Sequence, residues 1–369
     1  MRLGLSVALI AVLLLPFASN LTEAQSGFQA LTHYAVTIYS GPDRANHIVG
    51  VLAPEAKVIL ETRNAAANWV LGRSTDGLVR GWMEIRFLDI DPDTSVVNLL
   101  VSNEIVFVPA EVPVVRTYDE INLDQYPVIP TDLGRARQIF EQGLILGNDP
   151  GVIAKIGDCI TESERFLYPF GWNRYNLGSY TNLQAVIDHF SASFSTNSLA
   201  AYDGLVTNAA LDPVFSNPLA CLPGESPLRC EYRVHRPAVA IIMFGAQDLL
   251  FTPPDQFDRN LRQIVHETIQ AGIIPILSTF PGNLALWEPS IQYNQIVIQI
   301  AVDYQIPLIN LWRALETLPN YGLNDDGRHL SVPVTEAGHL TPENLARGYP
   351  MRNLVTLQTL DVVWREAMY

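Results

Sequence analysis

Two uninterrupted apolar runs constrain the fold of this chain more than any other feature. Ala238–Phe244 and Ile273–Leu277 contain no charged side chain. A strand without alternating polar residues is buried on both faces. A helical pattern lies between them, because Asp255–Ala271 spaces its apolar residues as a helix does and is followed by Gly272. Strands that alternate with helices predict a parallel sheet with helices on both faces.

The same alternation extends over residues 132–369. It predicts two more strands, at Val152–Ile156 and Pro307–Leu311. It also predicts three more helices, from an N-cap at Asp132 to Gly147, over Ile291–Tyr304 and over Leu354–Met368. Ligands of such sheets bind at the carboxyl ends of the strands. The residues that follow the strands are therefore the candidate site residues.

Three short stretches follow strands or stand near the end of this region. They are Gly157-Asp158-Cys159-Ile160-Thr161, Gly245-Ala246-Gln247-Asp248 and Asp326-Gly327-Arg328-His329. Their order and spacing resemble the SGNH hydrolases, or GDSL esterases, which have Gly-Asp-Ser, Gly-x-Asn-Asp and Asp-x-x-His there. The family's second-block glycine is best matched by Gly178. The resemblance covers about residues 132–369 and implies a three-layer, flavodoxin-like α/β fold.

Two blocks depart from the family at the reacting atoms. Cys159 stands where the family has its serine, and Gln247 where it has the oxyanion-hole asparagine. The resemblance implies Cys159 as nucleophile, His329 as base and Asp326 as the residue that orients the imidazole. It places the oxyanion between the N–H groups of Cys159 and Gly178 and the Gln247 amide. We expect the N-terminus of the following helix to favour the thiolate.

Two functions remain open from the sequence. The first is an ester hydrolase that acts on small acyl esters or on acetyl groups of extracellular or cell-wall polysaccharide. The second is a degenerate, non-catalytic binding protein with the same fold. We interpret Asp158 and Asp248 as structural and His339 as solvent-exposed. The histidines show no metal-ligand spacing. The resemblance to the SGNH hydrolases implies no metal or organic cofactor.

Residues 28–92 predict a small all-β barrel, because short β-branched and aromatic runs alternate with turn residues. The stretch Val36 to Pro42, the Asp76-Gly77 turn and Gly81-Trp82 resemble the bacterial Src-homology-3-like domain, which usually has Arg where Tyr39 stands. That resemblance implies either a cell-wall ligand or a mere spacer. Residues 93–131 contain four prolines that forbid a long helix, and we interpret them as a linker.

The first residues predict a signal peptide, residues 1–24. Arg2 precedes an uncharged apolar run, Leu3–Phe17, that is shorter than the ~20 residues of a spanning helix. An uncleaved anchor is the alternative. Either way we expect an extracytoplasmic protein, secreted or associated with the cell envelope, with no membrane contact after cleavage. The formal net charge of −15 argues against a nucleic-acid partner.

The three cysteines fit an oxidising compartment. Cys221 and Cys230 flank a turn-rich loop with two prolines and a glycine, and we expect them to form a disulfide. Cys159 is then left as the single free thiol. A single free thiol is either an inert buried residue or a nucleophile. The position of Cys159 in the block after the first strand of the α/β region favours the nucleophile.

Overall fold

The computed structural model describes residues 28–44, 46, 48–75, 79–91, 95–104, 106 and 121–369. The expected signal peptide, the Asp76-Gly77 turn and the linker prolines Pro109 and Pro113 lie outside the described residues. None of the helices that the structure describes is long and apolar enough to cross a membrane.

The N-terminal part is an antiparallel β-rich domain, here called the β domain (residues 28–104). Its strands follow the order β3-β2-β6-β5-β4-β1-β7, with the short β8 pairing with β4 in parallel. The bounds are β1 Phe28–Thr32, β2 Val36–Tyr39, β3 Ile48–Leu52, β4 Lys57–Arg63, β5 Trp69–Ser74, β6 Arg80–Glu84, β7 Leu88–Ile90 and β8 Leu100–Val101. The predicted all-β organisation is confirmed, and the Src-homology-3-like resemblance stays a prediction.

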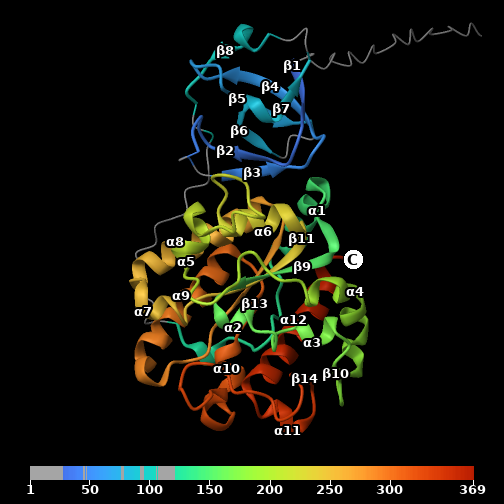
Figure 1. Ribbon diagram of the computed structural model, residues 1–369, viewed down its shortest axis with the longest axis vertical. Helices are drawn as coiled ribbons and strands as arrows, with labels where there is room; N and C mark the ends of the chain where they lie inside the picture. Colours follow the sequence, from blue (N-terminus) through green and yellow to red (C-terminus); the bar gives the residue numbers. More distant parts are fainter. Residues whose placement is uncertain are drawn as a thin grey trace, which may run out of the picture.

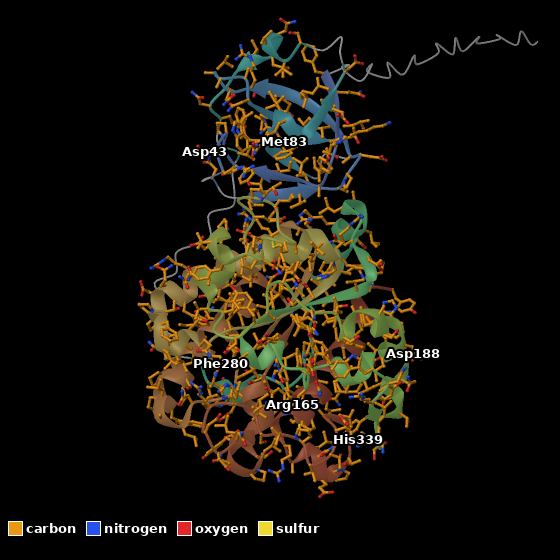
Figure 2. All side chains as sticks on the ribbon, in the orientation of Figure 1. Asp43, Met83, Arg165, Asp188, Phe280 and His339 are labelled. Carbon is orange, nitrogen blue, oxygen red and sulfur yellow. A yellow bond between two sulfur atoms is a disulfide. The ribbon has the colours of Figure 1, made fainter. Side chains whose placement is uncertain are left out.

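The β domain has its own core. The alternating burial of β3 turns Ile48, Gly50 and Leu52 to one face. Trp82 is fully buried, and its indole N–H donates to the carbonyl oxygen of Glu104 at 2.7 Å. Met83, labelled in Figure 2, is also fully buried.

The second part is built on a four-stranded parallel sheet with the order β13-β12-β11-β9. Its strands are β9 Asp149–Gly157, β11 Pro237–Met243, β12 Ile274–Ser278 and β13 Leu308–Ile309. Every residue of β11 and β12 is buried, as the apolar runs require. The parallel register pairs Met243 with Gly157, so both strands end at the same edge.

Helices cover both faces of this sheet (Figure 1). One layer contains α1 Ala136–Leu146, α4 Gln184–Phe194 and α12 Gly348–Ala367. The other contains α5 Thr207–Leu211, α6 Pro227–His235, α8 Pro254–Gln270 and α9 Trp287–Tyr304. Shorter elements connect them, namely α2 Cys159–Glu162, α3 Tyr168–Gly171, β10 Tyr175–Asn176, α7 Asp248–Phe251, α10 Leu311–Glu316, β14 Gly338–His339 and α11 Pro342–Leu345. The predicted three-layer α/β fold is confirmed.

Several predicted boundaries are wrong. Helix α1 begins at Ala136, because the Asp132 carboxylate accepts the N–H of Gly134 in a turn and does not cap the helix. Helix α12 begins at Gly348, six residues before the predicted start, because Pro350 falls in its first turn, where no N–H partner is needed. Strand β13 keeps only Leu308–Ile309 of its predicted range.

The described end of the expected linker lies along the α/β domain. Asn310 donates its side-chain N–H to the carbonyl oxygens of Leu123 and Tyr126, at 2.7 and 3.1 Å. The backbone N–H of Asn310 donates to Val128 O at 3.0 Å. These bonds fix residues 121–130 against the carboxyl end of β13, which brings them close to the edge where the strands end.

Candidate active site

The candidate nucleophile stands at a sharp turn between β9 and α2. Strand β9 ends at Gly157, and Asp158 caps the next helix by accepting the N–H of Ile160 at 3.0 Å. Cys159 is therefore the first residue of α2, half-buried at the carboxyl edge of the sheet. It is the single free cysteine of the chain.

The structure brings three of the predicted site residues into one chain of contacts. The sulfur of Cys159 lies 3.4 Å from Nε2 of His329. Nδ1 of His329 lies 2.7 Å from Oδ2 of Asp326. Because the carboxylate accepts from Nδ1–H, the tautomer that fits leaves Nε2 as an acceptor facing the thiol. Thiol, imidazole and carboxylate thus have the order in which a proton could pass from sulfur to imidazole.

The carboxylate of Asp326 is held as an anion by its own loop. Its Oδ1 accepts the backbone N–H groups of Arg328 and His329, each at 3.0 Å. Burial alone would raise the pKa of Asp326, but these bonds and the imidazole lower it to about 2. The carboxylate therefore stays charged at neutral pH and can orient the imidazole.

The thiol has the opposite tendency. Burial raises the pKa of Cys159 to about 11, and the charges of Asp158 and Asp203 act in the same direction. The N-terminus of α2 acts in the expected direction, because the N–H of Ile160 lowers the pKa of Cys159, but burial and the two carboxylates outweigh this effect. The resting nucleophile is thus a neutral thiol, and attack requires a base.

Gln247 reaches the sulfur from the neighbouring strand. It follows β11 and precedes α7, and its Nε2 lies 3.8 Å from the sulfur of Cys159. The methylene that distinguishes Gln from Asn lets the amide contact the nucleophile itself. The amide is near the reacting atoms but is engaged with sulfur in this state.

These contacts bring the nucleophile, the base and the orienting carboxylate together from β9 and from the loop after α10. Residues 156–343, just over half of the chain, match the GDSL-like Lipase/Acylhydrolase family. The chain belongs to this family.

Solved structures with the same fold are distant in sequence. An acetylxylan esterase from Geobacillus stearothermophilus is 17% identical, covers 58% of this chain and 94% of its own, and gives a TM-score of 0.38. A GDSL-like lipase from Bacteroides thetaiotaomicron is 15% identical, covers 61% of this chain and 97% of its own, and gives a TM-score of 0.38. No curated protein matches the sequence.

In this GDSL-like chain, the structure does not bring Gly178 to the reacting atoms. Its N–H, the expected oxyanion donor, donates to the side chain of Asn176 at 3.0 Å. Gly178 follows β10, which pairs with β14 and not with the central sheet. The expectation for Gly178 therefore fails, because this donor is already used within its own turn.

A segment that the sequence argument missed pairs with the end of β9, next to Cys159. The N–H of Gly157 donates to Ala200 O at 3.0 Å, and Gly157 forms a parallel bridge with Ala201. Asp203, two residues after this bridge, lies close enough to Cys159 for its charge to raise the pKa of the thiol, and Gly204 is the next residue of the chain. The signal in the sequence was the Asp-Gly pair that follows the short apolar stretch Leu199–Ala201.

Asp158 and Asp248 are fully buried, and their contacts are structural, as predicted. One oxygen of Asp248 accepts both the N–H and the hydroxyl of Thr207, at 3.0 and 2.6 Å. Burial raises the pKa of Asp158 to about 6. His339 contacts Thr335 at 3.0 Å and is labelled near the lower end of the molecule in Figure 2.

The expected disulfide between Cys221 and Cys230 is present. In the part of the chain that the structure describes, these cysteines and Glu225 form the one group with metal-ligand spacing. The two sulfurs are bonded to each other, so neither is a free thiolate ligand.

Proposed function

We propose that this protein is a thiol-dependent ester hydrolase. The observation that carries the proposal is the continuous contact from the Cys159 sulfur through the His329 imidazole to the Asp326 carboxylate. Membership in the GDSL-like Lipase/Acylhydrolase family supports acyl transfer as the reaction. A site that only binds a ligand would not need a thiol, a base and an orienting carboxylate in this order.

The proposed reaction has two steps. The sulfur attacks the ester carbonyl carbon while the thiol proton passes to Nε2 of His329, which then gives it to the departing alkoxide. The alcohol leaves and an acyl thioester remains on Cys159. Water then attacks the thioester carbonyl and gives a proton to His329, which returns it to the sulfur as the carboxylic acid leaves.

The developing oxyanion needs donors that the resting site offers in part. We propose the backbone N–H groups of Cys159 and Gly204 as two of them, in place of the predicted pair with Gly178. The Gln247 amide is the third candidate and must turn from the sulfur to the carbonyl oxygen. Loss of one such donor costs roughly 2.7–4 kcal/mol of transition-state stabilisation in known cases.

Export and substrate belong to the same proposal. The uncharged N-terminal run supports an exported protein, and the disulfide fits an oxidising compartment. We propose acyl esters of extracellular or cell-wall polysaccharide as the substrates. The β domain would then hold the enzyme at a wall ligand or serve as a spacer.

The second candidate function is binding without catalysis. It is favoured by two observations at the sulfur, the raised pKa of Cys159 and the contact of Gln247 with Sγ. Both weaken the nucleophile or the oxyanion site. A site that has lost its reaction in place would regain it when Cys159→Ser is combined with Gln247→Asn.

Hydrolysis of p-nitrophenyl acetate by the full mature protein with a mild reductant tests the proposal. We expect turnover that Cys159→Ala abolishes and that Asp326→Asn lowers by roughly 10²–10⁴-fold in kcat, because the imidazole loses its orienting carboxylate. Turnover that survives Cys159→Ala would remove the proposed nucleophile. Turnover that arises only in the Cys159→Ser, Gln247→Asn double variant would establish the binding alternative.

A further inference from the structure

A pocket lies at the carboxyl edge of the sheet, next to the loops that build the triad. Its volume is about 430 Å³, within the ~300–1,000 Å³ of small-ligand sites. Its lining combines three aromatic rings with side chains that carry carboxylate or amide groups, Trp287, Trp312, Tyr321, Asp124, Glu316 and Gln295. None of these residues has a role in the proposed reaction.

The pocket and the triad share two loops. The loop after β12 enters the pocket at Gly282 and continues to Leu284, whose N–H donates to Gly327 O at 2.9 Å. Gly327 lies between Asp326 and His329, the two triad residues of this loop. Tyr321 of the pocket precedes Asp326 by five residues on that same loop. These two loops connect the lining of the pocket to the loop that carries Asp326 and His329.

The ring of Trp287 contacts both of the other rings. The centroid of Trp287 lies 4.7 Å from those of both Trp312 and Tyr321, with interplanar angles of 43° and 49°. No ligand atom fits between rings at that separation, so they make a platform and not a cage. Trp312 is only 9% exposed, so Trp287 and Tyr321 are the rings that a ligand can reach. A Cβ at position 282 would overlap both indoles, and Gly282 leaves the space in which they meet.

The backbone that presents Tyr321 is strained. Asn320 and Tyr321 have φ values of 51° and 55°, in the left-handed region that costs non-glycine residues energy. The ring of Tyr321 packs on Trp287, yet the residue is 43% exposed. Strain of this kind persists where the surrounding structure imposes it, and it gathers at ligand sites.

We propose that this pocket binds a sugar ring of the ester substrate, an inference that rests on the proposed function. The electron-rich faces of the platform suit the C–H face of a pyranose. Asp124 and Glu316 accept hydrogen bonds from sugar hydroxyls, and Gln295, whose N–H is bonded to Ile121 O, offers its carbonyl oxygen. The two carboxylates and the net charge of −15 favour a neutral sugar over a uronic acid.

Calorimetric titration of the full-length Cys159→Ala protein with neutral hexasaccharides tests the pocket separately from catalysis. The probes are cellohexaose, xylohexaose and chitohexaose. We expect at least one to bind, and Trp287→Ala and Tyr321→Ala each to weaken it roughly tenfold or more through the lost stacking. Tyr321→Phe, which keeps the ring, and Tyr369→Ala, an exposed tyrosine outside the pocket lining, are expected to keep the affinity.

The outcomes separate the two proposals. If hexasaccharide binding depends on Tyr321 but the protein with Cys159 intact shows no esterase turnover, the proposed function is rejected and the sugar site is kept. Binding of none of the three probes, or equal affinity in the Tyr321→Ala and Trp287→Ala variants, would overturn the sugar site. Binding of choline that depends on Trp287 without any hexasaccharide binding would also overturn it in favour of a cation site.

Discussion

The sulfur of Cys159 experiences opposing influences from its neighbours. Burial and the nearby carboxylates keep the proton on sulfur, whereas the imidazole of His329 at 3.4 Å offers a place for it. The Gln247 amide donates weakly to the same atom. Reactivity at this residue therefore depends on whether the proton leaves only during attack or beforehand.

Alkylation of Cys159 by iodoacetamide is expected to be slow at neutral pH. The thiolate reacts, and with a pKa of about 11 its fraction rises roughly tenfold for each pH unit across the range 7–9.5. The rate constant should follow that slope without a plateau. The measurement is the alkylation rate by mass spectrometry, which is specific because the other two cysteines form the disulfide.

A plateau near pH 7 would contradict this prediction and indicate a preformed thiolate–imidazolium pair. The His329→Ala variant serves as the control. If the thiol is neutral at rest, removal of the imidazole should leave the slope of the pH profile unchanged.

At the scale of elements, the turn after β11 decides where Gln247 lies. Gly245 has a φ of 124°, and a Cβ there would overlap the ring of Phe280. Phe280, fully buried and labelled in Figure 2, follows the neighbouring strand β12. The loop that carries Gln247 is thus shaped by packing between two strand ends.

Gly245→Ala is expected to destabilise the protein by about 3 kcal/mol, from backbone strain and from overpacking against Phe280. Gly204→Ala is the matched control, since Gly204 also has a positive φ of 79° but has no atom within 4 Å of its Cβ position. It should cost only about 1 kcal/mol. Urea unfolding monitored by circular dichroism compares the two, and equal costs would rule out the packing explanation.

At the scale of the whole molecule, the two parts share a polar and aromatic contact, visible where β2 and β3 approach α6 and α8 in Figure 1. Nε2 of His266 lies 3.1 Å from the carbonyl oxygen of Ile48. Arg229 lies over the ring of Tyr39 and forms an ion pair with the buried Glu267 at 3.0 Å. Tyr39, which replaces the usual arginine of the resembled domain, is therefore engaged with the α/β domain.

Arg229→Ala is expected to lower the free energy of unfolding by about 3 kcal/mol, because Glu267 is 5% exposed and would keep a buried charge without its partner. Arg259→Ala removes an ion pair whose partners are 59% and 71% exposed and should cost less than about 1 kcal/mol. Urea unfolding of both variants provides the measurement. If both variants lose a similarly small amount of unfolding free energy, the contact between the two parts contributes little to stability.

The sequence by itself determined the parallel sheet, the helix layers and three members of the site. Apolar runs such as Ala238–Phe244 must be buried on both faces, and parallel strands carry their following residues to one edge. Cys159, Asp326 and His329 were then assigned from the resemblance of their blocks to the SGNH hydrolases. The disulfide followed from the short, turn-rich loop between its cysteines.

Only the tertiary structure decided the quantities that depend on distant neighbours. The pKa of Cys159 depends on burial and on the charge of Asp203, and the segment that pairs with Gly157 comes from a distant part of the chain. The aromatic platform joins residues from two helices and a strained loop. Local pattern fixes periodicity and turns, whereas electrostatic environment and convergence of side chains arise only when remote segments pack together.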